Sequence, residues 1–175
     1  FAYAPLQKEA IRKAMTENCL VLTGGPGTGK TTTVNAILQL LEHQAERVAL
    51  CAPTGRAAKR LSELTGRKAS TIHWLLEVDY SGGVVSFIHN DKNLLKCDVV
   101  ILDEMSMVDV KLFQALIAAL RYSCRIIMVG DADQLPSVGP GNILGEIIRS
   151  QLVPTVCLNE IFRQAQQSLI VTNAH

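Results

Sequence analysis

Apolar residues along this chain follow two patterns, one typical of buried strands and one typical of amphipathic helices. Residues 99–102 read Val-Val-Ile-Leu without interruption, as expected of a strand that helices cover from both sides. Between residues 34 and 41, apolar side chains recur at i, i+3, i+4 and i+7, which predicts a helix with one face packed on a sheet. Because such segments alternate, we expect an α/β fold with a mostly parallel sheet and helices on both faces.

The same patterns divide most of the chain into elements. Pro53 ends the second strand, and Ser81-Gly82-Gly83 separates two β-prone runs, which predicts an inserted β-hairpin. Strands are expected at residues 19–23, 47–52, 98–102, 125–129 and 154–158, and the hairpin at 78–89. Helices are expected at residues 7–16, after Lys30, at 71–76, 110–120 and 143–149, and in part of 160–175. A further helix ends near Gly66, with an apolar stripe at Ala57, Ala58, Leu61 and Leu64.

Composition is that of a globular protein. A length of 175 residues fits one domain, and 48% apolar residues supply a core. A net charge of +1 neither indicates nor excludes nucleic acid. The five cysteines lie mostly in apolar runs without C-x-x-C spacing, which favours reduced thiols in a cytoplasmic protein. No apolar run approaches the roughly 20 residues that span a bilayer, so we expect no membrane partner.

The most informative motif follows the first predicted strand, where residues 23–33 read TGGPGTGKTTT. Residues 24–31 fit G-x-x-x-x-G-K-[ST], in which backbone N–H groups surround a phosphate chain, Lys30 reaches the β- and γ-phosphates, and the Thr31 hydroxyl ligates Mg²⁺. The dipole of the following helix favours the same anion. The sequence therefore predicts a nucleoside triphosphate site at Gly24, Gly25, Pro26, Gly27, Thr28, Gly29, Lys30, Thr31 and Thr32.

Two carboxylates, Asp103 and Glu104, end the most apolar predicted strand. Beside a phosphate-binding loop, the first carboxylate holds Mg²⁺ and the second orients and deprotonates the attacking water, which favours hydrolysis over phosphoryl transfer to another substrate. Gln134 follows the next strand in Gly-Asp-Ala-Asp-Gln, where a neutral amide can hydrogen-bond a γ-phosphate or a water. Taken alone, that segment is more simply a turn.

Several segments together are similar to one family. The chain contains, in this order and spacing, Gln7, TGGPGTGKTT, APTGRAAKRL, STIH, VVILDEMSMVD, VGDADQLPSVGPGNIL and LNEIFRQ. They resemble the motor domain of superfamily 1 DNA helicases of the RecD/TraA type. The resemblance implies a RecA-like sheet in which strand 125–129 lies between strands 19–23 and 98–102. It also implies a motor that hydrolyses ATP and translocates on single-stranded DNA, in recombination and repair or in conjugative transfer.

The resemblance also assigns roles to individual residues. Gln7 resembles the glutamine that reads the adenine of ATP, and Arg163 the arginine that reaches the γ-phosphate; otherwise both are simply surface helix residues. The implied catalytic residues are Lys30, Asp103, Glu104, Gln134 and Arg163, with Thr31 and Asp103 as ligands of Mg²⁺. The implied DNA contacts, mostly to phosphate and sugar and therefore tolerant of base sequence, are Pro53, Thr54, Gly55, Arg56, Thr71 and His73.

Trp74, the only tryptophan, adjoins these segments. Because it lies in a short apolar helix, we expect it to pack in the core, and a platform on which a base stacks is the alternative.

In the family, two RecA-like domains enclose ATP, and the second domain carries its own arginine finger. We therefore expect residues 1–175, which begin with Phe1 and not with Met, to be a single motor domain and a fragment of a longer protein. Its expected partners are single-stranded DNA, the second motor domain and other nuclease or helicase subunits. A small P-loop kinase and a non-catalytic nucleotide-binding module are the alternatives. The few late arginines argue against the kinase, and the intact Lys30, Thr31, Asp103 and Glu104 against the non-catalytic module.

Overall fold

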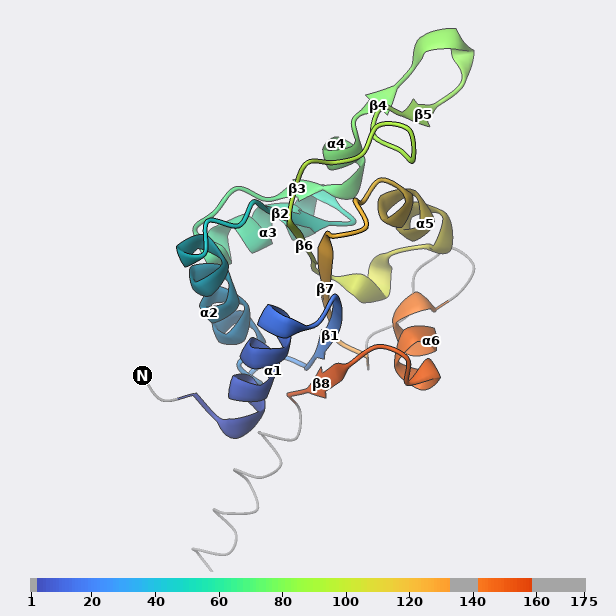
Figure 1. Ribbon diagram of the computed structural model, residues 1–175. Helices are drawn as coiled ribbons and strands as arrows, with labels where there is room; N and C mark the ends of the chain where they lie inside the picture. Colours follow the sequence, from blue (N-terminus) through green and yellow to red (C-terminus); the bar gives the residue numbers. More distant parts are fainter. Residues whose placement is uncertain (1–2, 133–141, 159–175) are drawn as a thin grey trace, which may run out of the picture.

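A six-stranded sheet forms the centre of the computed structural model, which describes residues 3–132 and 142–158 (Figure 1). All of its strand pairs are parallel, in the order β3-β2-β6-β7-β1-β8. The predicted sheet is therefore confirmed, including the position of β7 between β1 and β6. The strands are β1 (Cys19–Thr23), β2 (Val48–Ala52), β3 (Ser70–Thr71), β6 (Val99–Leu102), β7 (Arg125–Gly130) and β8 (Thr155–Cys157).

Helices cover both faces of this sheet, because successive side chains of each central strand point to opposite sides. In β1, Leu20 and Leu22 pack in a cluster with the first three helices, whereas Val21 packs with the last three. Residues of β6 and β7 alternate in the same way. The helices are α1 (Pro5–Thr16), α2 (Lys30–His43) and α3 (Gly55–Thr65) on one face, and α4 (Ile72–Leu76), α5 (Val110–Ala118) and α6 (Ile143–Ser150) on the other.

The apolar stripe predicted for α2 is confirmed, since all four of its residues are buried. The stripe predicted for α3 is wrong at Leu64, which is 48% exposed. The buried face of α3 consists of Ala58, Leu61 and Thr65, whose i, i+3, i+7 spacing leaves Leu64 beside that face. Gly66 ends the helix as expected, in the left-handed conformation with φ 68°.

The inserted hairpin is also confirmed, with β4 (Val78–Asp79) antiparallel to β5 (Ser86–Phe87). It projects from α4 away from the sheet (Figure 1). The sequence did not predict β3, a two-residue edge strand without an apolar run, nor the 3₁₀ turns η1 (Ser81–Gly83) and η2 (Met105–Met107). The helix expected within 160–175 lies outside the described residues.

All five cysteines are free thiols. Within residues 3–132 and 142–158, no helix is both long and apolar enough to span a membrane.

Candidate functional site

The phosphate-binding motif forms the connection between β1 and α2. Gly27 and Gly29 have φ of 78° and 83°, a left-handed conformation that glycine adopts without the steric cost of a Cβ atom. Gly29 is the N-cap of α2 and has no side chain to cap the first turn of that helix. The amide groups of that turn and the helix dipole therefore suit an anion.

Neighbouring side chains fix the shape of this loop. The Thr33 hydroxyl donates to the Gly29 carbonyl at 2.8 Å, and Gln7 Nε2 donates to the same oxygen at 3.3 Å. A Cβ at Gly29 would lie 2.5 Å from Gln7 Nε2, and one at Gly24 would lie 2.5 Å from Thr28 Oγ1. Gln7, which sequence alone placed on the surface, is only 8% exposed. The glutamine that the resemblance links to adenine recognition thus contacts the phosphate-binding loop directly.

The acidic pair follows β6 at the same edge of the sheet. The backbone N–H of Asp103 donates to the carbonyl of Cys51 at 2.9 Å, which fixes the end of the strand against β2. Glu104 has φ 53° and ψ 45°, a left-handed conformation that is strained for a residue with a side chain. The next turn packs closely on Gly130 of β7, where an added Cβ would lie 3.1 Å from the Cβ of Met105.

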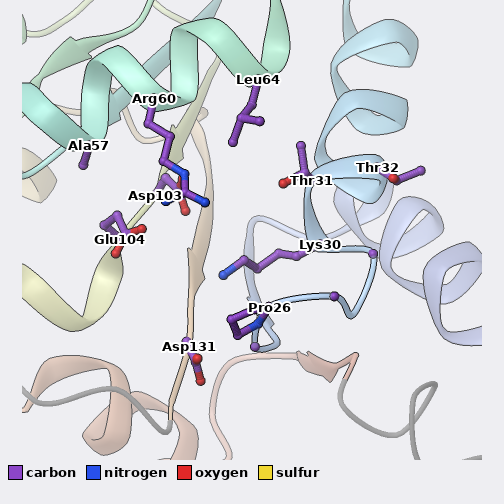
Figure 2. A pocket seen from close by; sticks show the side chains of 13 residues that line it. Pro26, Lys30, Thr31, Thr32, Ala57, Arg60, Leu64, Asp103, Glu104 and Asp131 are labelled. Carbon is purple, nitrogen blue, oxygen red and sulfur yellow. The ribbon is translucent and has the colours of Figure 1, made fainter.

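These segments meet around one cavity of about 450 Å³ (Figure 2), a volume in the range of small-molecule sites. In Figure 2, Lys30 extends from the start of α2 into the space before Asp103 and Glu104, and Arg60 points from α3 toward the same carboxylates. The lining residues are Gly25, Pro26, Gly27, Gly29, Lys30, Thr31, Thr32, Ala57, Arg60, Leu64, Asp103, Glu104 and Asp131.

Burial and charge act in opposite directions on the two carboxyls. Burial raises the pKa of Asp103, while a hydrogen bond from the backbone N–H of Glu104 and the charges of Lys30 and Arg60 lower it. Burial and the charge of Asp103 raise the pKa of Glu104, against the charges of Lys30 and Arg60. The cavity therefore places two cations beside two carboxylates.

The donor set in this cavity fits Mg²⁺. This ion prefers oxygen ligands and is usually held by one or two protein groups together with phosphates and waters. Thr31 supplies a hydroxyl and Asp103 a carboxylate, both from the cavity lining. In the described part of the chain, no three His, Cys, Asp or Glu side chains form a metal-binding group, so the closed site of a structural metal is not seen there.

The cavity brings together most of the predicted nucleotide residues. Gly24 and Thr28 lie buried within the loop instead of lining the cavity, and Gln134 and Arg163 lie outside the described residues. Sequence reasoning missed Arg60. It lines the cavity with Ala57 and Leu64 of α3, and its approach depends on how α3 packs beside the phosphate-binding loop, for which the sequence offered no local signal.

The residues expected to contact DNA lie at the carboxyl ends of β2 and β3. Ala52 pairs with Thr71, so the segments that begin at Pro53 and Ile72 leave the sheet side by side. Thr54 Oγ1 accepts a hydrogen bond from the N–H of Ala57 at 3.1 Å, and Thr71 Oγ1 caps α4 in the same way. Each hydroxyl keeps its own proton to donate. Gly55, Arg56 and His73 are exposed, and His73 also contacts the ring of Phe87, with centroids 5.8 Å apart.

The expectation that Trp74 packs in the core is wrong, since its side chain is 62% exposed. Its neighbours Ile72 and Leu76 carry the buried face of α4.

Comparisons with known proteins agree with this geometry. Residues 7–140 match a family model described as an AAA domain. The ATP-dependent RecD2 DNA helicase of Deinococcus radiodurans is 46% identical over 156 residues, which cover 89% of this chain and 21% of that protein. The RecBCD enzyme subunit RecD of Mycolicibacterium smegmatis is 41% identical over 167 residues, covering 81% of this chain and 30% of that subunit.

A solved structure shares the fold. The crystal structure of Pif1 from a Bacteroides species in complex with ADP-AlF4 aligns with a TM-score of 0.64 over 93% of this chain and 43% of that one, at 23% identity. The chain spans less than a third of the length of the two curated relatives, RecD2 and RecD. With the ordered motifs, the parallel sheet and the matched family model, the chain belongs to the AAA-domain family, and it is similar to one region of the RecD-type proteins named above.

Proposed function

We propose that this chain is the ATP-binding and ATP-hydrolysing motor domain of a DNA helicase that translocates on single-stranded DNA. The observation that carries the proposal is the single cavity that the phosphate-binding loop shares with Asp103 and Glu104 (Figure 2). Binding alone requires the loop, whereas hydrolysis also requires a group that takes a proton from water. Neither the relatives nor the acidic pair favours a kinase or a non-catalytic module.

The residues of the cavity divide this chemistry among them. Backbone N–H groups of the loop and Lys30 bind the phosphates, and the amide of Gln7 recognises adenine. Thr31 and Asp103 hold Mg²⁺, which supplies charge neutralisation at the phosphate oxygens. Glu104 orients the attacking water and accepts its proton. Gln134 and Arg163, outside the described residues, complete the proposed set at the γ-phosphate.

The surface beside the cavity is proposed to bind DNA through Pro53, Thr54, Gly55, Arg56, Thr71 and His73. Hydroxyls, backbone N–H groups and a guanidinium suit phosphate and sugar, so binding is tolerant of base sequence. A second RecA-like domain and, by analogy with the RecBCD subunit RecD, other nuclease or helicase subunits are the proposed protein partners. The proposed setting is recombination and repair in the cytoplasm.

Nucleotide binding by the chain and ATP turnover by the two-domain protein test this function. Lys30→Ala removes charge-assisted hydrogen bonds from the phosphates and is expected to weaken ATP binding about tenfold or more.

Glu104→Gln keeps the shape of the side chain but not its basicity, so binding stays and turnover falls about a hundredfold or more. Lys96→Ala, an exposed lysine that precedes β6 at the opposite edge of the sheet, serves as the control. Unchanged turnover in Glu104→Gln would contradict the assignment of the base.

A further inference from the structure

The backbone of α4 forces Trp74 out of the core. Ile72 and Leu76 have no exposed surface, and they lie four residues apart on one face of the helix. At 100° per residue, Trp74 lies about 200° from Ile72, on the opposite side of the helix axis. The indole is therefore 62% exposed and presents an aromatic surface to solvent.

A lysine lies over this ring. The Nζ atom of Lys68 is 4.8 Å from the centroid of Trp74, within the range of a cation–π interaction. The backbone N–H of Trp74 donates to Thr71 Oγ1 at 3.0 Å. This hydrogen bond fixes the start of α4 to the end of β3. The ammonium group of Lys68 therefore lies over one face of the ring, so a base has to stack on the opposite face.

The ring lines a groove of about 640 Å³ between α4 and the start of the hairpin. The groove is lined by Thr71, His73, Trp74, Leu75, Glu77 and Val78. Glu77 is the only acidic residue among these six, and its Oε2 lies 2.7 Å from His89 Nε2. The carboxylate is thus held by a hydrogen bond to a neighbouring side chain.

We propose that Trp74 is a stacking platform for one base of single-stranded DNA and that Lys68 contacts the adjacent phosphate. The inference rests on the proposed function, since two residues proposed to contact DNA, Thr71 and His73, line the same groove. An aromatic face beside a positive charge complements a nucleotide, which offers a planar base and an anionic phosphate. Every base has a π-face, so a site of this kind adds affinity without sequence preference.

Fluorescence tests the contact directly because Trp74 is the only tryptophan of the 175 residues. The chain is titrated at low salt with oligothymidylate of about ten nucleotides, which lies within the range of about 4 to 16 nucleotides that single OB folds cover. An abasic oligonucleotide of the same length keeps the phosphates and lacks the bases. Stacking predicts that oligothymidylate quenches the tryptophan emission and that the abasic strand quenches it far less.

Variants then separate stacking from charge. Fluorescence anisotropy of a labelled oligothymidylate measures the affinity of each variant. Trp74→Ala is expected to weaken binding about tenfold, whereas Trp74→Phe keeps an aromatic face and most of the affinity. Lys68→Ala lowers the salt dependence by about one phosphate contact. Tyr122→Ala, an exposed aromatic residue in the turn before β7, is the matched control and leaves affinity unchanged.

The outcomes distinguish this proposal from the one on which it rests. The stacking site is wrong, and DNA binding stands, if oligothymidylate binds without changing the tryptophan emission. The same conclusion follows if Trp74→Ala binds oligothymidylate as tightly as the unsubstituted chain does and the abasic strand binds as tightly as oligothymidylate. If no oligonucleotide binds in the anisotropy assay, both proposals fail. Circular dichroism of Trp74→Ala shows whether this variant folds. If it does not fold, the affinity of Trp74→Phe for oligothymidylate tests the stacking site.

Discussion

Arg60 adds a positive charge to the candidate nucleotide site. This charge comes from α3 and not from the phosphate-binding motif. It lines the cavity with Lys30. Burial raises the pKa of both Asp103 and Glu104, and the charge of Arg60 opposes that rise. A nucleoside triphosphate adds several negative charges to the same space. Arg60 thus has two kinds of anion within its reach, the carboxylates of the domain and the phosphates of the nucleotide.

We expect Arg60→Ala to weaken binding of the nucleotide about fivefold at low salt, because an exposed charge contributes about 1 kcal/mol. Arg60→Lys retains the charge and part of the affinity. Lys59→Ala removes an exposed charge from the neighbouring position of α3, which does not line the cavity. Titration with a fluorescent ATP analogue measures all three. Equal affinities of Arg60→Ala and Lys59→Ala would show that Arg60 does not act on the nucleotide.

Among the strands, Asp98 connects the segments that enter the sheet at the edge away from the cavity. Its carboxylate accepts hydrogen bonds from the backbone N–H of Arg47 at 2.7 Å and from Arg121 Nη2 at 2.9 Å. The side chain of Arg47 also donates to it, at 3.2 and 3.3 Å. Residues before β2 and β7 are thus fixed to the residue that precedes β6.

This connection predicts a dependence of stability on pH. Hydrogen bonds from the side chain and the backbone N–H of Arg47 lower the pKa of Asp98 from 3.8 to about 2. A lowered pKa stabilises the fold above the unfolded value, and that stabilisation disappears as pH falls from about 4 through about 2. Asp98→Asn is expected to lower the free energy of unfolding at neutral pH and to flatten its acid dependence in this window. Denaturant unfolding across pH measures both.

Asp91→Asn provides the control, since this aspartate is exposed in the turn before residue 93. If Asp98→Asn and Asp91→Asn give the same pH profile, the contacts of Asp98 do not stabilise the fold.

The elements that sequence predicted best are those whose burial is complete. Strands β1, β6 and β7 were found because uninterrupted apolar runs need helices on both faces. The edge strand β3 was missed because Ser70 and Thr71 are polar and only half-buried, and hydrogen bonds to β2 alone define the strand. In α4, composition suggested a buried tryptophan, whereas the i, i+4 spacing of Ile72 and Leu76 gives its true direction.

The candidate site was predictable where backbone geometry selects residue types. Left-handed φ at Gly27 and Gly29 and the small space at Gly24 leave a fixed pattern in the sequence. Burial of Gln7 and the approach of Arg60 depend on how α1 and α3 pack against the loop and the cavity. Such distances arise from tertiary structure and leave no local spacing to recognise.

At the scale of the whole molecule, the important feature is that every element lining the cavity belongs to one domain. Its lining comes from the phosphate-binding loop, α3 and the ends of β6 and β7, which are elements of one sheet and its helices. The curated relatives described above are more than three times as long as this chain. We propose that a second RecA-like domain covers the site and supplies an arginine finger there.

The 175-residue chain alone is therefore expected to bind ATP, to hydrolyse it slowly and to unwind no DNA. An arginine finger supplied across an interface contributes about 10³ to 10⁵ in rate, and a closed site excludes water from the reacting groups. Adding the second motor domain, covalently or in trans, should restore turnover that single-stranded DNA stimulates. Arg163→Ala or Gln134→Ala should abolish that gain, whereas Lys96→Ala should keep it. Steady-state ATPase rates of the short and long proteins, with and without DNA, decide the matter, because equal rates for the two would mean that one domain forms the complete catalytic site.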